Sequence, residues 1–140
     1  MIQEDKKLLF KDLCARLPYG VKFPMMCWDE EKGEVIKSVI LYSINKDGYC
    51  HVSEEDYSPY IDEIKPYLFP MSSMTDEQYN EFFAFFHDVE MKEIETSGDY
   101  LKAAYLGENA KCDWLNKNHF DYRYLIEKGL ALDATGLNIY

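Results

Sequence analysis

Residues 21–53 read VKFPMMCWDEEKGEVIKSVILYSINKDGYCHVS, and this stretch decides the fold class. Its apolar and β-branched runs predict three strands, at 21–28, 34–44 and 49–53. Glu31-Lys32-Gly33 predicts a tight turn after the first run. Asn45-Lys46-Asp47-Gly48 predicts another, because an Asp-Gly pair supplies the positive φ that short hairpin connections need. The stretch therefore predicts a small antiparallel β-meander of about three strands.

The segment before the meander predicts a helix. From Gln3 to Leu17, apolar side chains recur at intervals of about four residues, which gives one core-facing stripe. Pro18 and Gly20 then end the helix, because proline lacks an amide hydrogen and glycine suits a left-handed C-terminal cap.

A connector and a longer helix follow the meander. Three prolines in residues 57–74 disfavour regular helix, so this segment is expected to be a packed connector. Thr75 and Gln78 then form a capping box, in which each side chain accepts from the other residue's amide. The helix should turn an aromatic stripe toward the core, made of Tyr79, Phe82, Phe83 and Phe86. Phe85 points off this stripe, so it either packs against the connector or contacts a partner.

Glycines divide the remainder into shorter predicted helices. Ser97-Gly98 ends the aromatic helix, and short helices are expected at 100–107 and 110–118. Asp121 is expected to cap a further helix that runs to Lys128. No structure is assigned to residues 130–140.

These elements predict an α+β fold, with the small antiparallel meander packed by an N-terminal helix and several C-terminal helices. The 140 residues, 47% of them hydrophobic, suit a single domain with one core. Within this domain, residues 1–56 are a β-rich front, 57–74 the connector and 75–140 a helical back.

Charge restricts the classes of partner. The chain carries 26 acidic and 15 basic side chains, a net charge of -11, which repels phosphate backbones and anionic membrane surfaces. We therefore expect no direct nucleic-acid binding. The acids are either a solvated surface or an acidic face that mimics nucleic acid. The sequence also lacks an apolar run of roughly 20 residues and the pattern of a signal peptide, so no membrane contact and a cytoplasmic location are expected.

The cysteines and histidines form no recognisable metal or catalytic motif. Cys50 and His51 are adjacent, but neighbouring side chains on a strand point to opposite faces. Zinc-type spacings are absent, so neither a metal nor a cofactor is expected. The four cysteines are predicted to be free and mostly buried. An alternative is a small hydrolase or thiol enzyme assembled from distant residues, with Cys27, His119 and Asp121 as its members.

The most concentrated polar group is His119-Phe120-Asp121-Tyr122-Arg123. A structural interpretation is a helix cap with an arginine–carboxylate pair, and a functional one is a small recognition surface. Four candidate binding residues come from this group, namely His119, Asp121, Tyr122 and Arg123, and Phe85 is the fifth. No catalytic residue is assigned.

Three blocks carry a resemblance to a known family: DLCARLPYGV at 12–21, EIKPYLFPMSSMT at 63–75, and HFDYR with LIEKGLAL at 119–132. With them the chain resembles an uncharacterised family that is abundant in the genomes of gut Bacteroidetes and their prophages. The chain departs from the family's pattern at Tyr124, where members often carry glycine, and at Asn118, where a second histidine is common. The resemblance implies an association with phage or other mobile elements.

We therefore expect a non-enzymatic protein-interaction or accessory module of phage or mobile-element origin, with a protein partner. The alternatives are the thiol enzyme and the acidic nucleic-acid mimic. The oligomeric state is left open.

Overall fold

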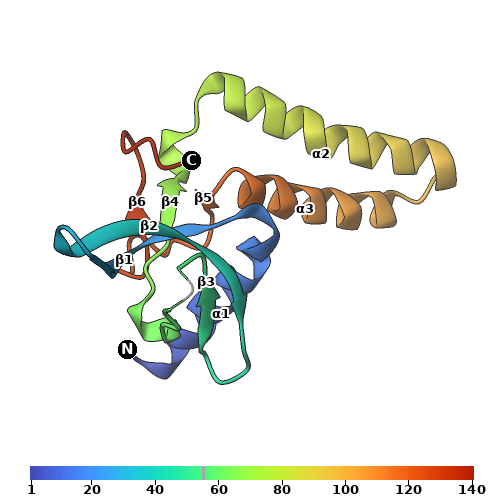
Figure 1. Cartoon of the computed structure of the whole chain (residues 1–140). Coiled ribbons are helices and arrows are strands. Elements are labelled where there is room, and N and C mark those ends of the chain that lie inside the picture. The colour runs from blue at the N-terminus through green and yellow to red at the C-terminus, as the bar shows by residue number, and fades with distance from the viewer. Residues whose placement is uncertain (55) are drawn as a thin grey trace.

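The computed structural model describes residues 1–54 and 56–140, and its α+β fold confirms the predicted class (Figure 1). The α-helices are α1 (Gln3–Arg16), α2 (Asp76–Ser97) and α3 (Tyr100–Lys117). The strands are β1 (Lys22–Asp29), β2 (Gly33–Ile44), β3 (Cys50–Val52), β4 (Tyr67–Pro70), β5 (Phe120–Asp121) and β6 (Leu132–Asp133). Short 3₁₀ turns, η1 (Leu17–Tyr19), η2 (Ile61–Glu63) and η3 (Met71–Ser73), join them.

The predicted meander is confirmed as an antiparallel sheet of order β1-β2-β3. Side chains alternate along β1, so that Val21, Phe23 and Cys27 are buried while Met26 and Trp28 are exposed. The buried side of the sheet packs with Leu9 and Leu13 of α1, which are fully buried, to form the main core. This core explains why the sequence shows both the apolar stripe of the helix and the apolar runs of the strands.

A second sheet lies where only a connector was predicted. Strand β4 pairs in parallel with β5 on one side and with β6 on the other. The residues that the sequence left unassigned at 130–140 thus supply β6 beside Tyr67. Strands of two to four residues carry too little periodicity for recognition in the sequence.

Helices α2 and α3 form an antiparallel hairpin that extends away from the sheets (Figure 1). The predicted capping box at its start is confirmed: the amide of Gln78 donates to Thr75 Oγ1 (3.1 Å), and the amide of Thr75 donates to Gln78 Oε1 (2.9 Å). The two short helices predicted around Gly107 are wrong, because α3 runs through it without a break. Gly107 instead allows close helix contact, since a Cβ there would collide with the side chain of Glu90.

The aromatic stripe of α2 does not face the main core as predicted. Phe82 packs its ring against Trp114 of α3 at a centroid distance of 5.2 Å, and Phe86 lies beneath the ammonium of Lys111. Tyr79 and Phe83 remain 56% and 46% exposed. Phe82 joins the smaller core around Trp114, Leu115 and Phe120, and the rest of the stripe lies along the hairpin that extends from the body.

The helix predicted from Asp121 to Lys128 is also wrong. Residues 122–129 form successive turns. Tyr124 has a φ of 60°, a left-handed conformation that cannot continue an α-helix and that glycine adopts at no steric cost.

Among the described residues, no helix is both long enough and apolar enough to cross a membrane.

Candidate functional site

The polar group at 119–123 is tied into the interior rather than presented to solvent. Asp121 is 4% exposed, and its two carboxylate oxygens accept from the amides of Leu125 (2.8 Å) and Ile126 (2.9 Å). The predicted capping role therefore exists, although what Asp121 caps is a turn. A carboxylate that is held by two buried amides stabilises the chain locally and has little capacity left for a ligand.

The arginine–carboxylate pair also exists, with a different carboxylate. Arg123 Nη1 donates to Asp12 Oδ1 at 2.8 Å. Asp12 additionally accepts from Arg16 Nε (2.8 Å) and Nη2 (3.1 Å), and both Asp12 and Arg16 are fully buried. Arg16 Nη2 also donates to the carbonyl of Phe120 at 2.7 Å. Charge-assisted bonds of this kind connect α1 to the segment after α3.

Tyr122 completes this network. Its hydroxyl donates to Asn116 Oδ1 at 3.0 Å, and the guanidinium of Arg123 lies 4.6 Å from the centre of its ring. Two segments distant in the sequence therefore meet here, with Asp12 and Arg16 from one and Phe120, Tyr122 and Arg123 from the other. The network therefore has a structural role, since it holds α1 against residues 120–123.

His119 is 8% exposed and lies under the ring of Tyr140, with 3.4 Å between ring centroids and 11° between planes. Burial lowers the pKa of His119 from 6.5 to about 4, and the positive charges of Arg16 and Lys22 act in the same direction. The imidazole is consequently neutral near pH 7.

Phe85 is 45% exposed and lies in a groove of about 490 Å³ on the hairpin. The groove is lined by Tyr19, Glu81, Phe85, Asp113, Trp114, Lys117 and Asn118. None of the four polar candidates lines it. The five residues predicted to bind thus do not form one surface.

The members of the thiol-enzyme alternative have other partners. Cys27 is buried, burial raises the pKa of its thiol, and its sulfur donates weakly to the carbonyl of Met25. Asp121 is engaged by backbone amides, and His119 is covered by Tyr140. Burial also raises the pKa of the Cys50 thiol to about 11. Such thiols carry little of the thiolate that nucleophilic chemistry requires.

All four cysteines are free: Cys27 and Cys50 are buried, Cys14 is intermediate and Cys112 is exposed. Within residues 1–54 and 56–140, no three histidine, cysteine, aspartate or glutamate side chains lie close enough together to hold a metal ion.

An exposed apolar surface lies at the start of α3, where the sequence predicted no binding residue. We call it the distal α3 face, and it consists of Tyr100, Leu101, Ala104 and Tyr105, all exposed. Tyr100, Leu101 and Tyr105 are 72%, 83% and 68% exposed. A shallow groove runs over Leu101, Ala104 and Tyr105.

Helix geometry explains why this face is free. The small side chains that turn toward α2, Ala103, Gly107 and Ala110, are buried. Leu101 and Tyr105 recur one turn apart on the opposite side of the helix, and within residues 1–54 and 56–140 no other element covers them. That spacing lies within the helix predicted at 100–107, but the sequence alone does not show which side of the helix α2 covers.

Comparisons with protein-family models, with curated proteins and with solved structures found no match to this chain.

Proposed function

We propose that the protein is a non-enzymatic interaction module that docks a protein partner on the distal α3 face. The observation that carries the proposal is the exposure of Leu101 (83%), with Tyr100 and Tyr105 beside it. Contiguous exposed apolar side chains on a small protein are typical of a binding surface, and tyrosine is enriched at the centre of such surfaces.

The polar residues that were predicted to bind a partner form hydrogen bonds within the chain, which also supports the proposal. Asp121 and Arg123 bond to the chain itself, and the buried thiols have raised pKa values. An origin in a phage or other mobile element is part of the proposal and rests on the resemblance of the three sequence blocks.

The test is a quantitative affinity capture from the native host with the wild type and with L101E/Y105E. Both changes lie on an exposed helix face and should alter the free energy of unfolding by less than about 1 kcal/mol. We expect the wild type to retain a stoichiometric partner that L101E/Y105E loses, because two carboxylates would be buried at the interface.

The matched control is Y42E/L137E, which makes the same chemical changes at Tyr42 (54% exposed) and Leu137 (52% exposed), away from the hairpin. It should retain the partner. Equal retention by L101E/Y105E, or the absence of any stoichiometric partner, would contradict the proposal.

The acidic mimic is a second candidate because of α2. This helix has seven acidic residues and one lysine, and Glu77, Glu81, Asp88 and Glu95 are exposed at spacings of four and seven that place them along one side. Such a stripe would face a basic groove on a nucleic-acid-binding protein. In that case the captured partner is displaced by duplex DNA and lost on E77Q/E81Q/D88N/E95Q, whereas L101E/Y105E retains it.

A further inference from the structure

Strand β1 forms one edge of the antiparallel sheet, because only one of its two sides pairs with β2. In an antiparallel pair, alternate residues turn both backbone groups toward the neighbouring strand. The amide of Leu41 donates to the carbonyl of Val21, which fixes the odd-numbered residues of β1 as those that bond β2. The even-numbered residues, from Lys22 to Trp28, therefore direct their amides and carbonyls to the free edge.

Tyrosine hydroxyls occupy the two ends of this edge. The amide of Lys22 donates to the Tyr140 hydroxyl, and the amide of Trp28 donates to the Tyr57 hydroxyl, each at 2.8 Å. Between them, Pro24 has no amide hydrogen. The middle of the edge thus exposes the carbonyls of Pro24 and Met26 and a single donor, the amide of Met26, which none of the described hydrogen bonds engages.

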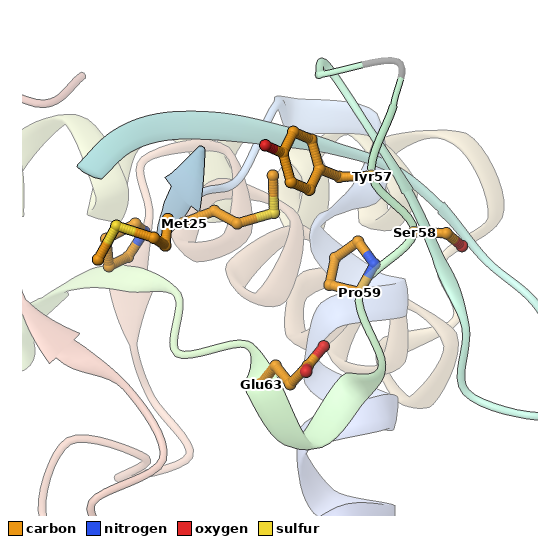
Figure 2. Close-up of a pocket in the computed structure, with 7 residues that line it drawn as sticks. Met25, Tyr57, Ser58, Pro59 and Glu63 are labelled. Atoms are coloured by element: carbon orange, nitrogen blue, oxygen red, sulfur yellow. The ribbon is translucent and has the colours of Figure 1, made fainter. Parts of the chain in front are cut away.

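A pocket of about 370 Å³ lies against this middle part. Figure 2 shows Met25, Tyr57 and Pro59 around the opening, and Glu63 on its lower side with the carboxylate directed toward Pro59. One carboxylate oxygen of Glu63 accepts from the amide of Tyr60 at 2.9 Å. Glu63 takes part in none of the salt bridges formed within residues 1–54 and 56–140.

The lining is rich in acceptors and poor in donors. Glu63 supplies a negative charge, the strand edge supplies carbonyl oxygens, and the ring of Tyr57 offers a face that attracts cations. Met25 and Pro59 provide apolar contacts for an aliphatic stem. The net charge of -11 favours the approach of a cation and disfavours an anion.

We infer that this pocket binds the side chain of an arginine or lysine presented by a peptide or protein. The cation would pair with Glu63 and the edge carbonyls, while the stem packs on Met25 and the Tyr57 ring. A second copy of the chain is the poorer fit at this edge, because Pro24 and the two tyrosine caps leave too few groups for strand pairing. The inference is independent of the hairpin, so neither test decides the other.

The experiment is an NMR titration of the ¹⁵N-labelled chain with the tripeptide acetyl-Gly-Arg-Gly-amide, and with its lysine and citrulline counterparts. Citrulline preserves the shape of arginine and removes the charge. We expect saturable shifts confined to the amides of residues 25–28, 57–58 and 60–63, and binding at least about tenfold weaker for the citrulline peptide.

The variant E63Q should weaken arginine binding by a similar factor, since it removes the charge and retains an acceptor for the Tyr60 amide. E127Q makes the same change on an exposed turn and should bind as the wild type does. Three results would each overturn the inference: no saturable shift up to about 10 mM peptide, equal binding of arginine and citrulline, or Met26 shifts that depend on protein concentration without peptide.

Discussion

His119 combines a left-handed backbone conformation, with φ at 63°, and a ring buried beneath Tyr140. A non-glycine residue is uncommon there, although histidine and asparagine tolerate it better than most. The neighbours Arg16 and Lys22 are both cations, so protonation of the imidazole would add a third positive charge in a buried place.

This setting predicts acid sensitivity. The folded pKa is about 4 and the unfolded value is 6.5, so between these values the unfolded chain binds a proton at His119 that the folded chain does not. The stabilising contribution of the neutral ring is present above pH 6.5 and is lost as the pH falls toward 4. NMR titration of the ring should give the low pKa, and urea unfolding across this window should give a falling free energy.

H119N provides the comparison, because asparagine accepts the left-handed conformation and does not titrate. Its free energy of unfolding should fall less than that of the wild type across the same window. Because both proteins contain the same carboxylates, subtracting the two pH profiles isolates the contribution of His119. Parallel pH profiles for the two proteins would show that His119 is not the sensitive group.

The limits of the sequence are clear for the residues at 119–123. The capping capacity of Asp121 was predictable, because short acidic side chains accept from nearby amides. The partner of Arg123 was not, since Asp12 lies 111 positions away along the chain. Burial of His119 beneath Tyr140 depends on the second sheet, which no local pattern indicated.

At the scale of the element, Gly107 decides how closely α2 and α3 approach. Glycine both ends helices and permits close helix contact, and the sequence does not distinguish the two uses. The predicted break at Gly107 was wrong for this reason. The break at Ser97-Gly98 was confirmed, because Gly98 adopts the left-handed cap and its amide donates to the carbonyl of Ile94.

G107A should therefore have opposite effects in two backgrounds. Alanine favours a helix by about 1 kcal/mol over glycine, but here its Cβ would collide with Glu90, for which overpacking costs of about 1–3 kcal/mol are usual. We expect G107A to destabilise the wild type and to stabilise E90A. Chemical denaturation of the four proteins in this double-mutant cycle measures both effects.

The double-mutant cycle is informative only if unfolding of the hairpin is detected. Denaturation is therefore followed by circular dichroism, which reports the helix content. A G107A change of the same sign and size in both backgrounds would mean that Glu90 is not the obstacle.

At the scale of the whole molecule, stability should be uneven. The main core packs fully buried residues from α1 and the meander, including Leu9, Leu13 and Leu41, whereas no described residue of α2 is buried. The base of the hairpin is held by a smaller core around Trp114 and Phe120. At its far end, the contacts among the described residues are those between the two helices.

Native-state hydrogen exchange should reveal this difference. Amides near Met91 and Leu101 should exchange through local opening, at a lower free energy than the amides of Leu13 and Leu41, which should require global unfolding. The ordering should persist in Y42E/L137E, whose changes lie outside the hairpin. Equal protection at the two places would instead mean that the hairpin and the body unfold as one unit.

The sequence predicts an element well where burial of one face produces a regular pattern of apolar residues. The apolar and β-branched runs in residues 21–44 predicted the meander and the stripe in residues 3–17 predicted α1, because both elements face the main core. The second sheet has strands of two to four residues, and β4 lies far along the chain from β5 and β6. Its pairing is set by long-range contacts, which a single sequence does not display.

The hairpin leaves the body after Met74 and returns at Asn118, and Phe82 touches Trp114 near its root. Both connections are therefore neighbours in space. Adding or deleting matched turns in the two helices would change the span of the molecule by about 1.5 Å for each residue pair while leaving the sheets in register. The two sheets and α1 can accordingly carry helical hairpins of different length. A hairpin from another protein could also be inserted between Met74 and Asn118.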